Sequence, residues 1–327
     1  MKSAQIPKYG PPEVIVVKDI PTPTLEDNEM LVKVHASSVN TIDTTTRSGK
    51  TPFFGLLRLS MGIRGPKSKG TGLDVAGEIV EVGKGITKFK IGDQIFGFGA
   101  CVGACAEYVK ASERGVVKKP ASLSYTEAAA VPLAALTALQ FLRDLGNIQD
   151  GQDILIYGAS GGVGTFAVQY ANFFNVNVTA VCSGKNTKLV RELGADRVID
   201  YEVDDFTKLE DKYDIIFDTV GKSPQRRWKK ALKDNGVFLQ AGSPKMSLFM
   251  LLLRMLGNKF RKKKIKMLVT TPNASDLTVL SQLFEQGKMK VVIDRTFTLD
   301  DIVEAHRYYD KGHSAGKVVI RVDHNLS

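Results

Sequence analysis

A glycine-rich turn between two apolar stretches has the spacing of a phosphate-binding site. The run Asp153–Tyr157 is strand-like, Gly158–Gly164 reads GASGGVG, and a helical pattern follows. A turn between a strand and a helix exposes unpaired N–H groups and the positive end of the helix dipole, and both bind anions. Gly161 lets the backbone approach a pyrophosphate, and Gly164 lets helix and strand pack closely. A tight turn without a ligand is the alternative. The predicted cofactor-binding residues here are Ser160, Gly161, Gly162, Val163 and Gly164.

The end of the next strand indicates which dinucleotide binds. An NAD site usually holds an acidic residue about twenty positions further on, where it binds the ribose hydroxyls. Here the strand ends in VCSGK, residues 181–185, and holds no carboxylate. Lys185 instead offers a cation where a 2′-phosphate would lie. The sequence therefore predicts NADPH, with an ordinary exposed loop lysine as the alternative interpretation of Lys185.

The elements that position these residues follow two different sequence patterns, one in each part of the chain. From Gly151 onward, short apolar runs alternate with helical patterns, which predicts βαβ units and a parallel sheet. Before about residue 120, strand-like pieces are separated by glycine- and proline-rich turns. The chain turns β-rich again from Val291. We therefore predict an α/β protein with a mostly β domain over 1–120, completed by 291–327, and a doubly wound Rossmann domain over 121–290.

Length and composition agree with this division. The 327 residues suggest two domains, and 43% hydrophobic with 24% charged residues is typical of a globular protein. The odd, sparse set Cys101, Cys105 and Cys182 argues against a disulfide framework and for a reducing compartment. The N-terminus has no apolar stretch after Lys2, so it does not resemble a signal peptide. We therefore expect a cytoplasmic protein.

The net charge of +10 would attract anions, but much of it is local. The run Lys259–Lys266 reads KFRKKKIK, and a solvated basic face is its simplest interpretation. The alternative function is a dinucleotide-binding interaction protein that acts on RNA or at a membrane surface, with vestigial redox activity. The run contains a single phenylalanine, so it lacks the interleaved aromatic residues that stack on single-stranded bases. No DNA partner is expected.

The segment 244–266 precedes and includes this basic run. Its apolar part, Met246–Leu256, is interrupted by Ser247 and Arg254, and it is far shorter than the roughly twenty residues of a membrane-spanning helix. Apolar residues recur at helical spacing, which predicts either a core helix or a mobile flap. We predict the flap, over the substrate side of the cleft, with bulky hydrophobic acceptors favoured. The basic run would hold it at an anionic membrane surface, as a weaker hypothesis.

The longest informative strings extend beyond the glycine turn. They are AAAVPLAALTALQFL, ILIYGASGGVGTFAVQYA, VTAVCSGKN, LGADRVIDY and VIDRTFTLDDIVEAHRYYDKGHSAGKVVI. In order and spacing the chain resembles, nearly end to end, the quinone oxidoreductases of the medium-chain dehydrogenase/reductase superfamily. The match is weaker between Pro52 and Lys69 and absent from about Pro244 to Lys264. The resemblance implies a GroES-like catalytic domain, a Rossmann domain, NADPH in the cleft between them, and a homodimer.

The resemblance also implies roles for particular residues. The family's nicotinamide-side asparagine matches Asn40 in SSVNTID, where Asp43 lies close by, and its ribose-side threonine matches Thr137 in LTAL. These matches make Asn40 and Asp43 the predicted catalytic residues and Asn40 and Thr137 cofactor contacts. Turn capping is the alternative role for Asn40. The family's 2′-phosphate contacts match Ser183, Lys185 and Tyr201, although Tyr201 also fits a half-buried core aromatic.

The chain departs from the zinc alcohol dehydrogenases of the same superfamily at the metal positions. Asn40-Thr41 stands where they have Cys-His, and Leu73-Asp74 stands where they have His-Glu. Cys101 and Cys105 lack the second pair that a four-cysteine site needs, so no metal site is predicted. Without a Lewis acid, conjugated acceptors suit hydride transfer better than simple carbonyls. The predicted activity is therefore NADPH-dependent, zinc-independent reduction of quinones or α,β-unsaturated carbonyls.

Overall fold

The computed structural model describes residues 1–50, 62–99, 102–221, 225–241 and 262–324. The chain forms two compact units. Unit 1 comprises residues 1–136 and 271–327, and unit 2 comprises residues 137–270. The sequence placed the boundaries near 120 and 290. In the structure, α3 (Tyr125–Ala130) packs on β3 and β4, and α9 (Ala274–Glu285) contacts β7, so both helices belong to unit 1.

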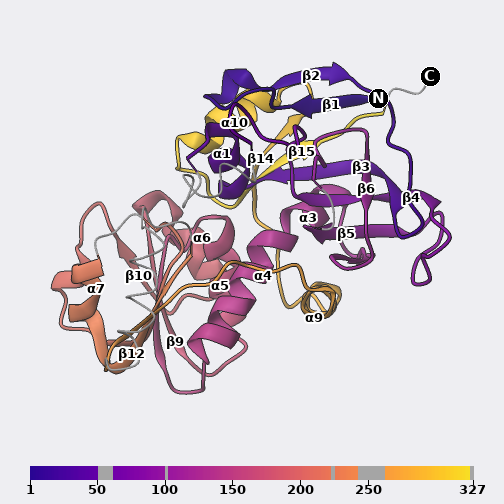
Figure 1. The fold of residues 1–327 in the computed structure, drawn as a ribbon. Helices are drawn as coiled ribbons and strands as arrows, with labels where there is room; N and C mark the ends of the chain where they lie inside the picture. The colour runs from indigo at the N-terminus through magenta and orange to yellow at the C-terminus, as the bar shows by residue number, and fades with distance from the viewer. Residues whose placement is uncertain (51–61, 100–101, 222–224, 242–261, 325–327) are drawn as a thin grey trace. The chain divides into compact units, whose positions relative to one another are not determined.

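The remaining elements follow in chain order (Figure 1). In unit 1 they are β1 (Lys2–Gln5), η1 (Pro12–Val14), β2 (Val16–Asp19), β3 (Met30–Val39), α1 (Thr41–Ser48), β4 (Asp74–Val82), β5 (Gln94–Phe98), β6 (Tyr108–Ala111), β7 (Val116–Lys118), β14 (Ile293–Thr298), α10 (Ile302–Asp310) and β15 (Lys317–Arg321). The helix α4 (Pro132–Gln140) leads into unit 2, which contains η2 (Phe141–Gly146), β8 (Asp153–Tyr157), α5 (Gly162–Ala171), β9 (Asn177–Cys182), η3 (Gly184–Asn186), α6 (Thr187–Glu192), β10 (Arg197–Asp200), η4 (Phe206–Lys208), β11 (Tyr213–Asp218), α7 (Gln225–Ala231), β12 (Leu232–Gln240) and β13 (Lys264–Lys266).

Unit 2 is built on a six-stranded sheet in the order β10-β9-β8-β11-β12-β13, in which every neighbouring pair is parallel. Successive side chains of a strand point to opposite faces, so both faces of this buried sheet need a cover. Trp228 of α7 packs in a cluster with Ile216 of β11. The next residue of that strand, Phe217, stacks on Phe141 of η2 at a centroid distance of 5.2 Å. Helical elements therefore cover both faces.

Unit 1 is mostly β. Its larger sheet has seven strands, in the order β14-β15-β3-β4-β5-β7, with β6 also pairing with β3. The C-terminal strand β15 lies antiparallel to β3, with Val318 opposite Val39. The smaller sheet pairs β1 with β2. This architecture and the parallel sheet of unit 2 confirm the predicted fold class, a GroES-like domain with a Rossmann domain.

A buried polar contact joins distant parts of unit 1. Arg47 of α1 is 2% exposed, and its Nη1 lies 2.9 Å from Nδ1 of His306 in α10. The same guanidinium donates to Asp310 and to the carbonyl of Gly10. Burial lowers the pKa of His306 to about 3, so the imidazole is neutral and accepts the Arg47 hydrogen bond.

The segment 244–266 is described only at its end. The predicted flap over Met246–Leu256 lies outside the described residues. The last three residues of the basic run form β13, the edge strand beside β12, in which Ile265 is buried and Lys264 exposed. No helix in the described ranges is long and apolar enough to cross a membrane.

Candidate active site

The glycine turn follows β8 directly. Gly158 adopts a φ of +76°, a conformation that side chains other than glycine rarely take. Gly161 is the N-cap of α5. A Cβ on Gly164 would lie 2.1 Å from the carbonyl oxygen of Gly158, closer than atoms can approach. The helix therefore begins against the turn because Gly164 has no side chain, and its first N–H groups lie at the carboxyl end of the sheet.

Two serine hydroxyls come together beside this turn. Ser160 and Ser183 are both buried, and Asn186 Nδ2 donates to Ser160 Oγ at 3.0 Å and to Ser183 Oγ at 3.4 Å. A hydroxyl that accepts from an amide keeps its own proton for another acceptor. Asn186 therefore orients both hydroxyls as donors. Sequence reasoning missed this residue, and the only signal was its place in the SGKN string.

The other two predicted phosphate contacts lie at the same corner. Tyr201, at 44% exposure, is not a half-buried core residue; its N–H donates to the carbonyl of Cys182, and its side chain hydrogen-bonds Ser183. Burial raises the pKa of Tyr201, and the Ser183 bond partly opposes this. Lys185 is exposed and has no ion-pair or hydrogen-bond partner among the described residues. The hydroxyls and this unpaired ammonium form a donor set that suits an anionic nucleotide.

Unit 1 holds a second polar group, assembled by strand register. Val318 lies opposite Val39, so Lys317 at the start of β15 comes beside Asn40 at the end of β3. Ala36 lies opposite Ala76, and the same register brings Ser38 beside Asp74 at the start of β4. The helix α1 begins at Thr41, directly after Asn40. Three strands and a helix therefore deliver their terminal polar residues to one buried place.

The side chains of this cluster are joined by a network of hydrogen bonds. Asn40 donates through Nδ2 to Asp74 Oδ2 at 2.9 Å and accepts at Oδ1 from Lys317 Nζ at 2.5 Å. Asp74 also accepts from Ser38 Oγ at 2.6 Å and from the Leu133 N–H at 3.0 Å. The Asn40 N–H donates to Asp43 Oδ2 at 2.9 Å. The structure thus brings the predicted residues Asn40 and Asp43 together and ties the Asn40 amide into an ion pair.

Burial controls the charges of the cluster. The side chains of Asn40, Asp43, Asp74 and Lys317 are all at most 6% exposed. Burial, together with the negative charge of Asp74, raises the pKa of Asp43 to about 7. Burial also lowers the pKa of Lys317, while the carboxylates of Asp74 and Asp43 oppose that shift. An Asp43 carboxyl that is partly protonated near neutrality is able to hold or release a proton.

Lys317 and the role of Asp74 were not foreseen. Asp74 was named only as a departure from a zinc pattern, and Lys317 was not singled out. A usable signal existed, because Lys317 begins the run KVVIRV and a lysine in an otherwise apolar strand is unusual. Its partner is 277 residues away in the sequence, however, and only the fold identifies it.

The remaining predicted residues fall outside both groups. Thr137 is buried in α4, where its Oγ1 lies 2.8 Å from that of Thr270. Cys105 and Cys182 are buried cysteines outside any disulfide bond, and burial raises the pKa of Cys182 to about 11. Cys101 lies outside the described residues. In the described part of the chain, no cluster of three or more His, Cys, Asp or Glu side chains is arranged to hold a metal ion.

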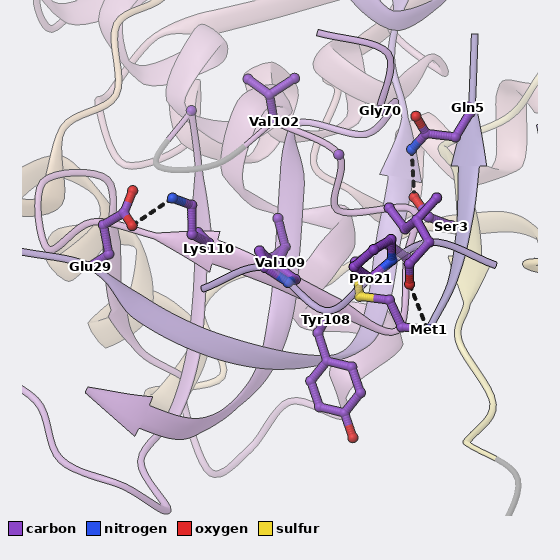
Figure 2. Close-up of a pocket in the computed structure, with 15 residues that line it drawn as sticks. Met1, Ser3, Gln5, Pro21, Glu29, Gly70, Val102, Tyr108, Val109 and Lys110 are labelled. Carbon is purple, nitrogen blue, oxygen red and sulfur yellow. Dashed lines mark hydrogen bonds and ion pairs between the residues drawn. The ribbon is translucent and has the colours of Figure 1, made fainter. Parts of the chain in front are cut away.

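A separate hollow of about 430 Å³ lies in unit 1 (Figure 2). None of the predicted site residues lines it. Four of its polar side chains form two pairs: Lys110 Nζ lies 2.7 Å from Glu29, and Gln5 donates to Ser3 at 2.8 Å. We assign this hollow no role in the reaction.

Comparison with known proteins agrees with this geometry. Residues 26–121 match the family model of the alcohol dehydrogenase GroES-like domain, and residues 193–320 match that of zinc-binding dehydrogenases. A chloroplast envelope quinone oxidoreductase homolog from Arabidopsis thaliana is 33% identical over 312 residues, which is 92% of each chain. The mitochondrial NAD(P)H oxidoreductase RTN4IP1 of Bos taurus is 35% identical over 363 residues, covering 97% of this chain and 88% of the relative.

The fold is also similar to that of a solved quinone oxidoreductase structure. The quinone oxidoreductase from Coxiella burnetii superimposes with a TM-score of 0.87 at 32% identity and covers 99% of both chains. These findings support an oxidoreductase that uses a nicotinamide dinucleotide and a small-molecule substrate. The chain belongs to the quinone oxidoreductase family of the medium-chain dehydrogenase/reductase superfamily.

Proposed function

We propose that this protein reduces quinones or α,β-unsaturated carbonyls with NADPH and without zinc. The observation that carries the choice of NADPH is Lys185, an exposed ammonium without a partner in the described part of the chain. It follows Ser183, whose hydroxyl is oriented by Asn186. A 2′-phosphate would give the Lys185 ammonium a counter-charge. The relatives named above fit this proposal, because their names include quinone oxidoreductase and NAD(P)H oxidoreductase.

In this proposal each group of residues has a separate task. NADPH supplies the hydride. Ser160 and the N–H groups from Gly161 to Gly164 hold the pyrophosphate, and Ser183, Lys185 and Tyr201 hold the 2′-phosphate. Thr137 contacts the ribose, and Asn40 binds at the nicotinamide side through the free lone pair of its Oδ1. Asp43 lies in the first turn of α1. Its side chain holds a proton, and its Oδ2 accepts from the Asn40 N–H.

The acceptor class follows from the side chains available. Asn40, Thr41, Leu73 and Asp74 offer no set of three soft or imidazole ligands for a catalytic zinc. Polarisation of the acceptor therefore depends on hydrogen bonds. Quinones and enones suit this arrangement, because hydride addition gives a delocalised anion that needs less stabilisation than an alkoxide.

The Lys185→Ala variant tests the cofactor. Loss of a charge-assisted hydrogen bond costs roughly 1.5 to 3 kcal/mol, which is about a tenfold to hundredfold rise in the Kd of NADPH. NADH lacks the 2′-phosphate, so its Kd should hardly change. Titration of both dinucleotides by intrinsic fluorescence measures the two constants. Lys188→Ala, which removes a nearby 89% exposed lysine side chain, is the matched control. Equal effects on NADPH and NADH would show that the proposed contact is wrong.

A substrate panel tests the reaction. NADPH oxidation should proceed with quinones and enones and be slower with simple aldehydes and ketones. A salt-dependent nucleic-acid binding assay run beside it addresses the alternative of an interaction protein with RNA. Binding to RNA without turnover of any acceptor would favour that alternative. The homodimer, the cytoplasmic location and a membrane-surface role for the basic run stay predictions.

Chelation tests the zinc-independence. The purified protein should contain no stoichiometric zinc, and prolonged treatment with a strong chelator should leave its quinone or enone turnover unchanged. Metal analysis of the protein before and after treatment provides the measurement. One firmly bound zinc ion per chain would return the assignment to the zinc alcohol dehydrogenases.

A further inference from the structure

Lys317 is a buried lysine for which the proposed reaction has no stated use. Its side chain is 3–4% exposed, and its ammonium contacts Asn40 Oδ1 at 2.5 Å and Asp74 Oδ2 at 3.5 Å. Burial of an ion pair costs desolvation energy, and well-packed apolar residues of similar volume are often at least as stabilising. Fold stability alone therefore gives no reason for a lysine at this position.

The two charges act on the Asn40 amide in a specific way. The two ends of a carboxamide have nearly the same shape and differ in hydrogen bonding. Lys317 presents a donor to Oδ1, and Asp74 presents an acceptor to Nδ2. A flipped amide would place its NH₂ group against the ammonium and its oxygen against the carboxylate. Both contacts would be repulsive, and they would be little screened in this buried place. One orientation of Asn40 is therefore fixed.

We propose that Lys317 is a positioning residue: with Asp74 as its counter-ion, it locks the amide of Asn40 in the orientation that the nicotinamide side of the reaction requires. This inference rests on the proposed function, in which Asn40 contacts the cofactor. It adds a role for a residue that begins the last strand of the chain. Because geometry errors of an ångström reduce rates by up to about a hundredfold, the lock acts mainly on turnover.

The experiment compares single and charge-balanced variants. K317M leaves Asp74 as an uncompensated buried charge, so it should melt well below the wild type. K317M/D74N removes both charges and should recover most of the melting temperature. Its kcat should nevertheless stay about tenfold to a hundredfold below the wild type, with less than about a threefold change in the KM of the acceptor. Addition of N40A to this background should cause no further loss of kcat, because the three residues act as one unit.

K233M is the matched control. Lys233 likewise forms ion pairs, with the carboxylates of Asp153 and Asp214, but it lies in unit 2 and outside the proposed site. Its loss should lower the melting temperature without a change in kcat. Wild-type kcat in K317M/D74N, or an additional loss from N40A as large as in the wild type, would overturn the positioning role.

A measurement without turnover separates this inference from the proposed function. The side-chain NH₂ resonances of Asn40, assigned by comparison with N40A, should exchange slowly with solvent in the wild type and become averaged and fast in K317M/D74N. If no acceptor is reduced but this change is seen, the lock stands and the proposed function fails. Fast exchange in the wild type would overturn the lock, even if the variants do not fold.

Discussion

Gly164→Ala is expected to destabilise unit 2 by about 3 kcal/mol or more. In an ordinary helix, this change would stabilise by up to about 1 kcal/mol, because alanine has the better helix propensity. Here the added Cβ would lie 2.1 Å from the Gly158 carbonyl oxygen and 2.7 Å from backbone atoms of Ala159. These neighbours are backbone and cannot rotate away. Overpacking of this kind costs about 1–3 kcal/mol and occasionally more, so the clash outweighs the gain in propensity. Thermal unfolding followed by calorimetry measures the difference.

Gly161→Ala is the matched control, three residues earlier in the same turn. Its Cβ would come no closer than 3.3 Å to the Gly158 carbonyl oxygen, so the neighbour needs to move only slightly. We expect a melting temperature near that of the wild type but weaker binding of NADPH, because the new methyl group hinders close approach of the pyrophosphate. Equal melting temperatures for the two variants would contradict the packing role of Gly164.

The second large effect concerns the pH dependence of stability. The carboxyl of Asp43 has a pKa of about 7 in the folded protein against an ordinary value of 3.8, because it is buried and faces Asp74. Lys317 from β15 and the Asn40 N–H oppose this increase, and Tyr309 of α10 also faces the group. Between about pH 4 and pH 7 the unfolded chain has released this proton and the folded protein retains it. The free energy of unfolding therefore falls as the pH rises through this window.

The Asp43→Asn variant should lose this decrease in the free energy of unfolding between about pH 4 and pH 7. The variant is neutral at every pH and keeps a side-chain oxygen that accepts from the Asn40 N–H. Each pKa unit corresponds to about 1.4 kcal/mol, so above pH 7 the variant should be more stable than the wild type by up to about 4 kcal/mol. Near pH 4 the variant and the wild type should have the same free energy of unfolding. Urea unfolding across this pH range gives the difference curve, and Asp204→Asn, at an exposed position, is the control. A wild-type curve parallel to that of Asp43→Asn would contradict the role of Asp43.

Local signals in the sequence were sufficient to place the strand, glycine turn and helix of the proposed nucleotide site. The strand, the glycine turn and the helix are adjacent in the chain, so the order Asp153–Tyr157, Gly158–Gly164 and α5 was readable directly. The close packing expected at Gly164 is present. Lys185 was predicted from the end of its own strand, and Ser183 and Tyr201 from the resemblance. These residues lie at the ends of two adjacent parallel strands, so their relation is nearly local.

Contacts between distant segments were not readable in the same way. Lys317 meets Asn40 only because β15 inserts beside β3 in one register, and a shift by one residue would turn its side chain to the other face. The edge strand β13 was also missed. Its three residues, Lys264–Lys266, look like part of a solvated basic run, and their strand conformation comes from pairing with β12 rather than from β propensity.

The insertion of β15 beside β3 determines when the protein is able to mature on the ribosome. A chain that has just made Asn40 must be extended by 277 residues before Lys317 is available. At about 5–20 residues per second, this takes roughly tens of seconds. During that time β3 lacks its β15 neighbour, the guanidinium of Arg47 lacks His306, and the carboxylate of Asp74 lacks its cation. All of unit 2 is synthesised in this interval, so we expect it to fold first, while β3 keeps an unpaired edge until β15 has been made.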